Sequence, residues 1–214
     1  MQQDRPCEGQ ADGVNIVSRR YQTLSKVALK SPTSRFFYPW PVVLVSCIDK
    51  DGKPNIITIG ASSICSSNPP TVGIAIGTAQ YSLGLIKRTK DFGVNLPTRD
   101  LLWQTDFCGS HSGRNMNKFE AAGLTVQPSK IIRSPLIAEC PVSMECKLIH
   151  AVSLGNHEWL IGEIVAVHCD EAILDERGEL DTSKVNPIFS YWAEYWSVGQ
   201  RLKDWHFSRT EPKP

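Results

Sequence analysis

Apolar and β-branched residues occur in short runs along the middle of the chain, and turn residues separate the runs. Residues 41–48 (PVVLVSCI) and 55–59 (NIITI) are two such runs, with the polar turn 49–52 between them. Val, Ile and Thr favour strands, so this pattern predicts a β-hairpin. Residues 71–77 (TVGIAIG) predict a third strand, and the sequence GVNLPT that begins at Gly93 predicts a return to β-structure.

Two other segments show helical spacing. Residues 81–92 (YSLGLIKRTKDF) predict a short helix, for which Ser82 is a candidate N-cap. Residues 186–207 place aromatic side chains three and four positions apart, which predicts a helical C-terminal segment that packs a core or a subunit contact. One stripe of this segment holds Phe189, Trp192 and Trp196, and the adjacent stripe holds Tyr191 and Tyr195.

Length and composition indicate one domain. The chain has 214 residues, 41% of them hydrophobic, which is enough for a full core. No linker, internal repeat or low-complexity tract divides it, so residues 1–214 are predicted to form a single domain. Residues 1–13 are polar and expected to be loose, and residues 16–29 are expected to form a short helix or strand at one end of the fold.

Charge and hydropathy argue against several classes of partner. The 23 basic and 22 acidic residues give a formal charge of +1, so no overall field recruits nucleic acid or an anionic membrane. No apolar run approaches the roughly 18 residues that span a bilayer. The first thirty residues lack the apolar core of a secretory signal. We therefore expect a soluble, cytoplasmic protein.

The cysteines do not form a recognisable framework. There are seven, an odd number, with no CxxC among them, which argues for reduced and mostly buried thiols. Cys108 and His111 make a C-x2-H pair, but no second pair matches it, so no metal site is expected. The sequence fingerprints of doubly wound dinucleotide folds, P-loop enzymes, zincins and α/β-hydrolases are absent as well.

Residues 55–70 (NIITIGASSICSSNPP) contain the strongest candidate for chemistry. A strand-like run opens into small and hydroxyl residues before a double proline. Small side chains expose backbone N–H groups and hydroxyls donate hydrogen bonds, so a flat ligand could lie against this segment. A Ser-rich strand end and loop without a ligand is the alternative. The candidate ligand-binding residues are Thr58, Gly60, Ala61, Ser62, Ser63 and Ser66.

Several ordered segments together carry a family resemblance. They are the 41–59 hairpin, ASSICSSNPPTVGIAI, KDFGVNLPT, CGSHSGRNMNKFEAAGL, PLIAECPVSMECKL and GNHEWLIGEIVAVHCDE. In this order they resemble the flavin reductase-like family of FMN-binding split barrels, and in particular its flavoredoxin-type branch. The resemblance covers roughly residues 38 to 200, and several ordered pieces are far more specific than one short motif.

The resemblance implies a mainly β fold with flanking helices, an antiparallel Greek-key FMN-binding split barrel of six or seven strands. The barrel is expected at about residues 38–175, and the aromatic segment 186–207 is expected to cross to a partner. Family members are homodimers with FMN at or near the subunit interface. A surplus of C-terminal aromatic residues fits such an apolar seam.

The resemblance also assigns roles to residues. It places the flavin ring against residues 58–63, with Ser66 as a candidate for the ribityl chain or the phosphate. Tyr81 and Ser82 begin a helix whose free N–H groups suit a phosphate, although an ordinary helix cap is an equal alternative. The glycine-rich loop 108–119 carries Arg114 and Lys118, which either close over an anionic cofactor or are plain surface charges.

His157 is the candidate catalytic residue. It lies in GNHE between two predicted strands, and a histidine at a hairpin tip is ordinarily solvated. Related reductases have a G-x-H element here that approaches the flavin or the nicotinamide. His150 and His168 lie within predicted strands and are interpreted as structural.

The resemblance predicts an FMN-binding, NAD(P)H-dependent flavin reductase, in which hydride passes from NADH or NADPH to the flavin. Such chemistry needs no obligatory protein acid, so the absence of a catalytic triad does not count against it. Electrons would leave as released reduced flavin or pass to an electron-accepting protein. The alternatives are a flavoredoxin-like FMN electron carrier reduced by a protein partner, and a non-redox dimeric barrel that binds another ligand.

Overall fold

The computed structural model describes residues 27–34, 36–203, 205–206 and 209. Contacts divide the chain into two units, residues 1–34 and 35–214. In the first unit only residues 27–34 are described, and they are exposed. The expectations for residues 1–13, and for most of 16–29, therefore lie outside the described residues. The single-domain organisation stays a prediction.

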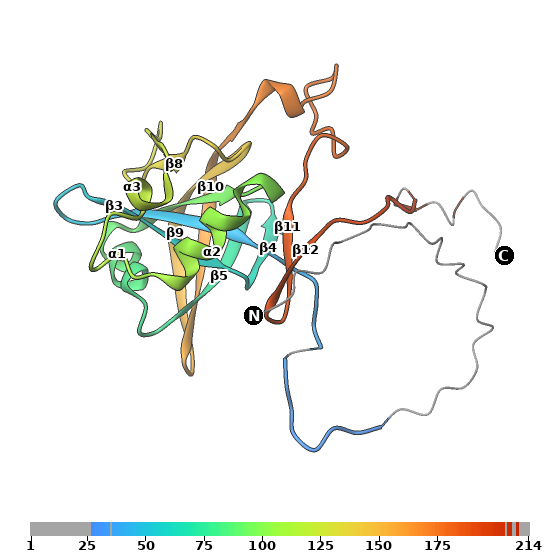
Figure 1. The fold of residues 1–214 in the computed structure, drawn as a ribbon, viewed down its shortest axis with the longest axis horizontal. Helices are drawn as coiled ribbons and strands as arrows, with labels where there is room; N and C mark the ends of the chain where they lie inside the picture. Colours follow the sequence, from blue (N-terminus) through green and yellow to red (C-terminus); the bar gives the residue numbers. More distant parts are fainter. Residues whose placement is uncertain (1–26, 35, 204, 207–208, 210–214) are drawn as a thin grey trace, which may run out of the picture. The chain divides into compact units, whose positions relative to one another are not determined.

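The second unit is built on a seven-stranded antiparallel sheet with the order β3-β2-β6-β9-β10-β5-β4 (Figure 1). Its strands are β2 (Val43–Ile48), β3 (Pro54–Ile59), β4 (Ser62–Ser67), β5 (Pro70–Gly77), β6 (Asp91–Leu96), β9 (Val142–Leu154) and β10 (His157–Cys169). Two smaller sheets comprise β1 (Trp40–Pro41) with β11 (Ile188–Tyr191) and β12 (Glu194–Ser197), and β7 (Val126–Gln127) with β8 (Leu136–Ile137). The helices are α1 (Tyr81–Thr89), α2 (Leu102–Ser110) and α3 (Lys118–Ala122), with 3-10 turns at Arg99–Leu101 and Glu171–Ile173.

This architecture confirms the predicted mainly β, antiparallel split barrel. The β2–β3 hairpin forms as expected, with Val43 opposite Ile59 and Ile48 opposite Pro54. Its turn is held by Asp49, whose Oδ1 accepts the N–H groups of Asp51 and Lys53, each at 2.8 Å. Gly52 follows with φ at 85°, a conformation that strongly favours glycine.

The order of the strands explains how the sheet closes. Strands β3 and β4 occupy opposite edges of the sheet, yet only Gly60 and Ala61 separate them in sequence. The chain therefore crosses from one edge to the other at this point. Ala75 N–H donates to the carbonyl of Ala61 at 2.9 Å, which fixes the crossing onto β5.

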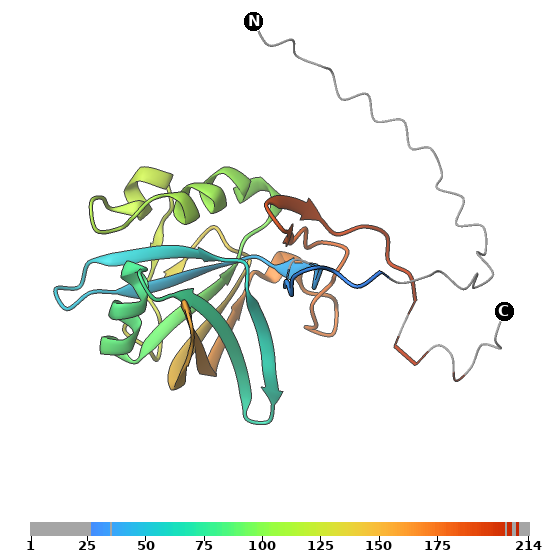
Figure 2. The same cartoon turned by 90° about the horizontal axis from the view of Figure 1, so that it is seen from below.

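Alternation along β2 and β3 places side chains in two separate cores. Val45 and Ile57 face the barrel interior with the buried residues of β5, β6 and α1, whereas Leu44 and Ile56 face the cluster formed with α2 and α3. Figure 2 shows α1 on one side of these strands and α2 and α3 on the other. Because strand side chains alternate between faces, two apolar faces of one hairpin require two covering layers.

The C-terminal segment corrects one sequence prediction. Residues 188–197 form the hairpin β11–β12 and not a helix, and β1 pairs with its β11 strand, with Trp40 opposite Ser190. Spacings of three and four between aromatic residues fit a helix, but aromatic side chains also favour strands. Strand β1 favours the strand conformation, because its pairing with β11 supplies backbone hydrogen bonds. Such long-range pairing is not visible in a short stretch of sequence. Trp192 lies at the turn of this hairpin with φ at 59°.

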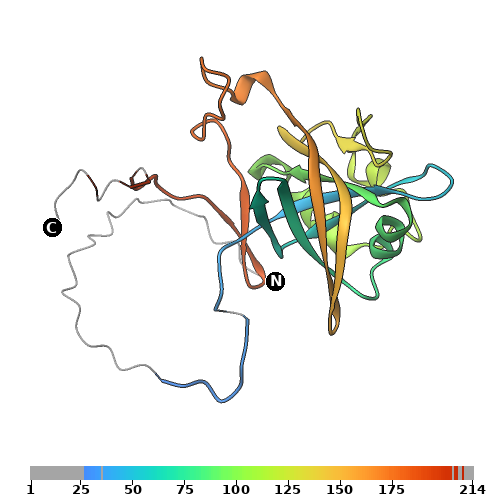
Figure 3. The same cartoon turned by 180° about the vertical axis from the view of Figure 1, so that it is seen from behind.

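The long hairpin β9–β10 projects from the sheet and turns at Gly155, where φ is 69° (Figure 3). Its return strand begins at His157, which pairs with Gly77 of β5. His168 lies near the other end of β10, within a strand as predicted. Among the described residues, no helix is long and apolar enough to cross a membrane.

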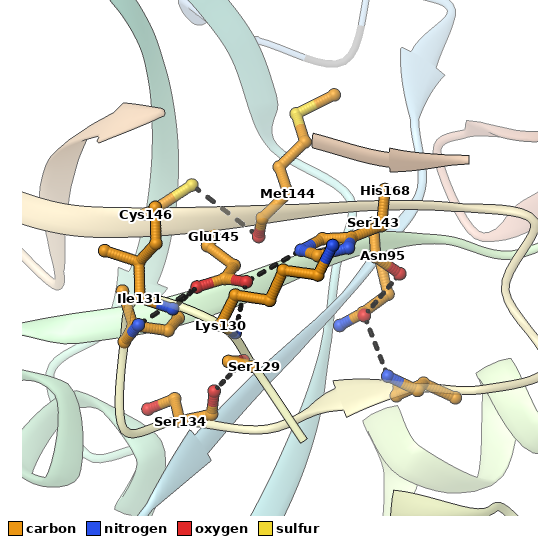
Figure 4. Close-up of polar contacts among 12 residues, drawn as sticks. Asn95, Ser129, Lys130, Ile131, Ser134, Ser143, Met144, Glu145, Cys146 and His168 are labelled. Atoms are coloured by element: carbon orange, nitrogen blue, oxygen red, sulfur yellow. Dashed lines mark hydrogen bonds and ion pairs between the residues drawn. The ribbon is translucent and has the colours of Figure 1, made fainter. Parts of the chain in front are cut away.

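A buried carboxylate fixes the loop before β8 (Figure 4). Glu145 of β9 is completely buried and accepts three backbone N–H bonds, from Lys130 at 2.7 Å, Ile131 at 2.7 Å and Ile132 at 3.0 Å. His168 Nε2 lies 2.7 Å from the same carboxylate. A charged acceptor with several N–H donors holds the loop more firmly than neutral hydrogen bonds do.

Two opposing effects act on the pKa of the Glu145 carboxyl. Burial raises this pKa, but the backbone N–H donors and the contact with His168 lower it more, so that it lies below its ordinary value. The charged form is therefore bound more strongly in the folded than in the unfolded chain. Its contribution to stability is complete above the unfolded pKa of about 4.3 and is lost as the pH falls through the folded pKa.

We expect Glu145→Gln to lower the free energy of unfolding by about 2–4 kcal/mol at pH 7, because an amide cannot satisfy the same donors. Urea unfolding followed by circular dichroism measures this loss. Glu139→Gln is the matched control, since Glu139 is exposed and accepts only the N–H of Thr125. The difference between wild type and Glu145→Gln should shrink below about pH 4. Equal losses in the two variants would contradict this role of Glu145.

Candidate functional site

A cleft of about 430 Å³ lies where the crossing between β3 and β4 meets the C-terminal hairpin. This volume is within the roughly 300–1,000 Å³ of small-molecule sites. Strands β3, β5 and β10 supply one side of the cleft, and helix α2 and the hairpin supply the other. Its lining includes Trp40, Thr58, Gly60, Ala61, Gly77, Gln80, Asp106, His157, Ser190, Trp192, Glu194 and Tyr195.

Four of the predicted residues come together in this cleft. Thr58, Gly60 and Ala61 line it from the crossing, and His157 lines it from the start of β10. At Gly60, an added Cβ would lie 3.2 Å from Ser190 Oγ, which is tighter than ordinary packing. The lack of a side chain there lets Ser190 of the hairpin pack against the crossing. His157 Nδ1 lies 2.8 Å from Asn156 Oδ1, a contact that orients the ring beside the cleft.

Three predicted serines do not line the cleft. They belong to β4, an edge strand that the sequence analysis did not predict. Ser62 Oγ donates to the carbonyl of Pro41 at 3.2 Å, and Ser63 Oγ donates to the carbonyl of Ile64 at 3.2 Å. Ser66 Oγ accepts the N–H of Asn68 at 3.2 Å. Because β4 is extended and pairs with β5, the chain moves away from the cleft by about 3.3 Å with each residue after Ala61. The three hydroxyls therefore lie outside the cleft.

The C-terminal hairpin provides site residues that sequence reasoning missed. Tyr195 O–H donates to Asp106 Oδ1 at 3.0 Å and so joins β12 to α2 across the cleft. Burial and the neighbouring Asp106 raise the pKa of Tyr195 to about 12, so its hydroxyl keeps the proton that it donates. The aromatic residues were visible in the sequence. Their assignment to a helix concealed that they face residues 58–61.

Ser190 is notable because its hydroxyl has no hydrogen-bond partner. The Oγ atom is buried, and none of the described residues pairs with it. A buried polar group without a partner costs about 1–3 kcal/mol, so such groups are uncommon. The hydroxyl lies beside Gly60 in the lining of the cleft. A ligand in the cleft supplies the missing partner only if the hairpin shifts slightly from Gly60, because the hydroxyl is enclosed between them.

A second, basic cleft of about 560 Å³ adjoins the first. Gln80 lines both, so the two clefts meet at this residue. The basic cleft follows one side of α1 and is lined by Thr78, Gln80, Tyr81, Lys87, Arg88 and Arg114, together with Leu83 and Gly84. Lys87 Nζ forms an ion pair with Glu158 at 2.9 Å.

Two predicted residues, Tyr81 and Arg114, meet in the basic cleft. The guanidinium carbon of Arg114 lies 5.4 Å from the centre of the Tyr81 ring, a cation–π contact, and Arg114 Nη2 donates to the carbonyl of Ala79 at 3.5 Å. Helix α1 begins here, with Gln80 as its N-cap and no side-chain capping bond. Leu83 N–H donates to the Gln80 carbonyl at 3.3 Å, so the N–H groups of Tyr81 and Ser82 are those left for an anion beside Arg114.

Ser82 is not the helix cap that the sequence suggested. It lies inside the first turn of α1, is buried, and accepts a hydrogen bond from Asn55 Nδ2 at 2.8 Å. Its hydroxyl belongs to an internal contact and does not line either cleft. A phosphate at this helix start would have to use backbone N–H groups and Arg114.

Lys118 has a structural position, contrary to the expected contact with a cofactor. It is 3% exposed, and its Nζ donates to the carbonyls of Ile56 at 2.8 Å and Cys108 at 2.6 Å. Burial lowers the pKa of Lys118, although the nearby thiols of Cys108 and Cys47 oppose this shift. The amine ties the end of α2 and the start of α3 to β3. Lys118 thus holds the loop between these helices against β3.

The thiol of Cys108 is completely buried, and His111, the other member of the C-x2-H pair, contacts Phe107. Burial raises the pKa of the Cys108 thiol to about 11, which makes it a poor nucleophile. His111 stacks on Phe107, with ring centres 4.2 Å apart. Within the part of the chain that the structure describes, no group of three or more potential ligands is placed to hold a metal.

Sequence comparison shows the family. The model of the flavin reductase like domain matches residues 34–187, so the chain belongs to the flavin reductase-like family. A protein of Archaeoglobus fulgidus is 33% identical over 146 residues, which cover 68% of this chain and 81% of that protein.

Solved structures show the same fold. Flavoredoxin of Desulfovibrio vulgaris (Miyazaki F) superposes with a TM-score of 0.79 and is 34% identical, covering 87% of this chain and all of that one. Flavoredoxin from Methanosarcina acetivorans has a TM-score of 0.78 and 27% identity, covering 86% and 99% of the two chains. Component B of nitrilotriacetate monooxygenase from Bacillus cereus, at 21% identity and a TM-score of 0.75, shares the fold over 85% of this chain and 99% of that one.

Proposed function

We propose that this protein binds FMN, with the flavin ring in the cleft at residues 58–61. The observation that carries the proposal is the small-residue crossing at Gly60 and Ala61 in the lining of the cleft, with the unpartnered hydroxyl of Ser190 packed against it. A flavin offers a flat ring with hydrogen-bonding atoms along one edge, which suits both features. Bound FMN supplies the hydride and electron chemistry, while the protein binds and orients it. Family membership supports the same cofactor.

The phosphate of FMN would lie in the basic cleft. This cleft meets the first at Gln80, so one ligand can place its ring and its anionic group in the two parts. Arg114 and the uncapped start of α1 supply a cation and free N–H donors. The first cleft instead carries the carboxylates of Asp106 and Glu194, which disfavour a phosphate there. The opposite charges of the two clefts thus orient the cofactor.

The proposed activity is NAD(P)H-dependent reduction of the bound flavin. His157 borders the cleft and would hold the nicotinamide of NADH or NADPH against the flavin, or stabilise charge that develops as hydride arrives. The second candidate is an electron carrier that receives electrons from a protein partner, which the likeness to two flavoredoxins favours. The six described cysteines are free thiols, which supports a reducing, cytoplasmic location.

A homodimer is part of the proposal. An apolar groove of about 460 Å³ lies on the C-terminal hairpin, lined by Tyr38, Pro39, Phe189, Tyr191, Trp196 and Val198, with Ser197 and Gly199. Trp196 is 55% exposed and Tyr38 is 53% exposed. Exposed aromatic residues at this density are typical of protein interfaces. We assign the groove to a second copy of the chain because the same hairpin lines the cofactor cleft, and the family resemblance implies a homodimer.

The FMN site predicts opposite effects for one substitution. Ser190→Ala should weaken FMN binding about tenfold, because the flavin loses one hydrogen bond of about 1–1.5 kcal/mol. The same change should leave the free energy of unfolding without FMN unchanged or slightly higher, since it removes an unpaired buried hydroxyl. Fluorescence titration and urea unfolding measure the two quantities. Ser63→Ala, outside the cleft, is the control. A wild type that binds no FMN at micromolar concentration overturns the function.

The donor can be identified by mixing the FMN-loaded protein with NADH or NADPH in a stopped-flow instrument. We expect flavin bleaching with one of them, and His157→Ala should slow it about tenfold to a thousandfold while FMN affinity stays the same. His150→Ala, in the exposed part of β9, is the matched control. Failure of both nucleotides to reduce the wild type favours the electron carrier, and an unchanged rate in His157→Ala removes this residue from the reaction.

The dimer predicts that Trp196→Glu gives a monomer, because a charge in an apolar seam is strongly disfavoured. Light scattering should report the mass of two chains for wild type. Trp103→Glu is the control, since Trp103 is also exposed, at 61%, but lies on α2 outside the groove. A wild type of single-chain mass excludes the dimer.

A further inference from the structure

Arg114 lies on an exposed loop, so a contact elsewhere in this loop must hold it in the basic cleft. The loop spans residues 111–117 between α2 and α3, and Arg114 itself is exposed. Its neighbour Gly113 is buried in the same loop. The contact that buries Gly113 therefore decides where the next residue can reach.

Gly113 packs directly on the side chain of Asn55. A Cβ added to Gly113 would overlap Asn55 Oδ1 and lie 2.7 Å from Asn55 Cγ, so only glycine allows this approach. Asn55 is 4% exposed, and its Oδ1 has no hydrogen-bond partner among the described residues. The space that a polar partner would occupy beside this oxygen is taken by the loop backbone.

Asn55 cannot readily move away. Its backbone is paired with Cys47 inside the β2–β3 hairpin, and its Nδ2 donates to Ser82 Oγ at 2.8 Å. Gly113, Asn55 and Ser82 therefore form one buried row from the loop to helix α1. Arg114 and Tyr81, the residues next to Gly113 and Ser82 in sequence, form the cation–π contact in the basic cleft. The buried row and the exposed contact hold the same two segments together.

We propose that Gly113 and Asn55 are positioning residues that hold Arg114 over Tyr81 and thereby set the preference of this protein for FMN over riboflavin. This inference rests on the proposed FMN site. A side chain at residue 113 displaces the loop and not the core, because the loop is exposed whereas Asn55 is fixed by the sheet and by Ser82. Arg114 then leaves the anion, while the surface at Gly60 and Ser190 that would hold the ring is unchanged.

The test compares the dissociation constants of FMN and riboflavin, which differ only in the phosphate. In Gly113→Ala, binding of FMN should weaken about tenfold to a hundredfold, the effect of losing one charge-assisted contact, while binding of riboflavin changes less than about twofold. A general loss of structure would weaken both ligands, so the ratio separates positioning from folding. The salt dependence of FMN binding should also become shallower in the variant.

A double variant that should restore the preference for FMN provides a second test. Asn55→Ala removes the atoms that a residue-113 methyl would meet, so the double variant Gly113→Ala with Asn55→Ala should recover the wild-type ratio to within about threefold. Asn115→Ala is the matched control, because its side chain lies in the same exposed loop and Asn115 makes only a backbone bond to Ser112. Asn115→Ala should keep the wild-type ratio.

Each outcome decides the proposal. Recovery in the double variant after selective loss in Gly113→Ala supports it. An unchanged ratio in Gly113→Ala, equal weakening of both ligands, or failure of the double variant to recover overturns it while leaving the FMN site intact. A wild type that binds FMN no more tightly than riboflavin overturns the inference together with the phosphate site, and a wild type that binds neither overturns the proposed function as well.

Discussion

The structure depends on one crossing of the backbone. Strands β3 and β4 lie at opposite edges of the seven-stranded sheet, and Gly60 with Ala61 carries the chain between them. The bond from Ala75 N–H to the Ala61 carbonyl fixes the crossing to β5. Because this corner has little side-chain bulk, it leaves room for a cleft where β10 and the C-terminal hairpin converge. The same geometry that closes the barrel thus creates the candidate cofactor cleft.

Buried polar groups then fix the loops around the barrel. Glu145 accepts three backbone N–H bonds from the loop before β8, and Lys118 donates to two backbone carbonyls below the loop between α2 and α3. Glu145 satisfies main-chain groups of a segment that has no regular structure of its own, whereas Lys118, at the start of α3, satisfies carbonyls of β3 and α2. A charge or amine buried in this way is costly unless every bond is made, so the loop geometry is tightly specified. The sheet is the rigid part of the fold, and the hydrogen bonds of these two residues hold the loops in fixed positions relative to it.

Much of the fold could be predicted because its signals are local. The β2–β3 hairpin, β5, α1 and β6 follow from apolar runs and turn residues, and the ordered motifs identified the family. Residues 58, 60 and 61 were found for the same reason, since small residues after a strand are visible in the sequence. His157 was found from its place at a hairpin tip and from the resemblance. Errors arose where one pattern suits two structures: the aromatic spacing of residues 189–196 fits both a helix and a strand, and the serines after Ala61 fit both a loop and an edge strand.

The sequence by itself therefore determined the strand and turn pattern, the family and the small-residue surface for a ligand, because each depends on neighbours within a few positions. Tertiary structure decided the rest. Ser190 and Tyr195 reach the cleft only because β1 pairs with β11 and brings the C-terminal hairpin over the barrel, where Tyr195 meets Asp106 of α2. Lys118 became structural because two carbonyls from distant segments converge on its amine. Such contacts join residues far apart in sequence, and no local pattern of polarity specifies which segments will meet.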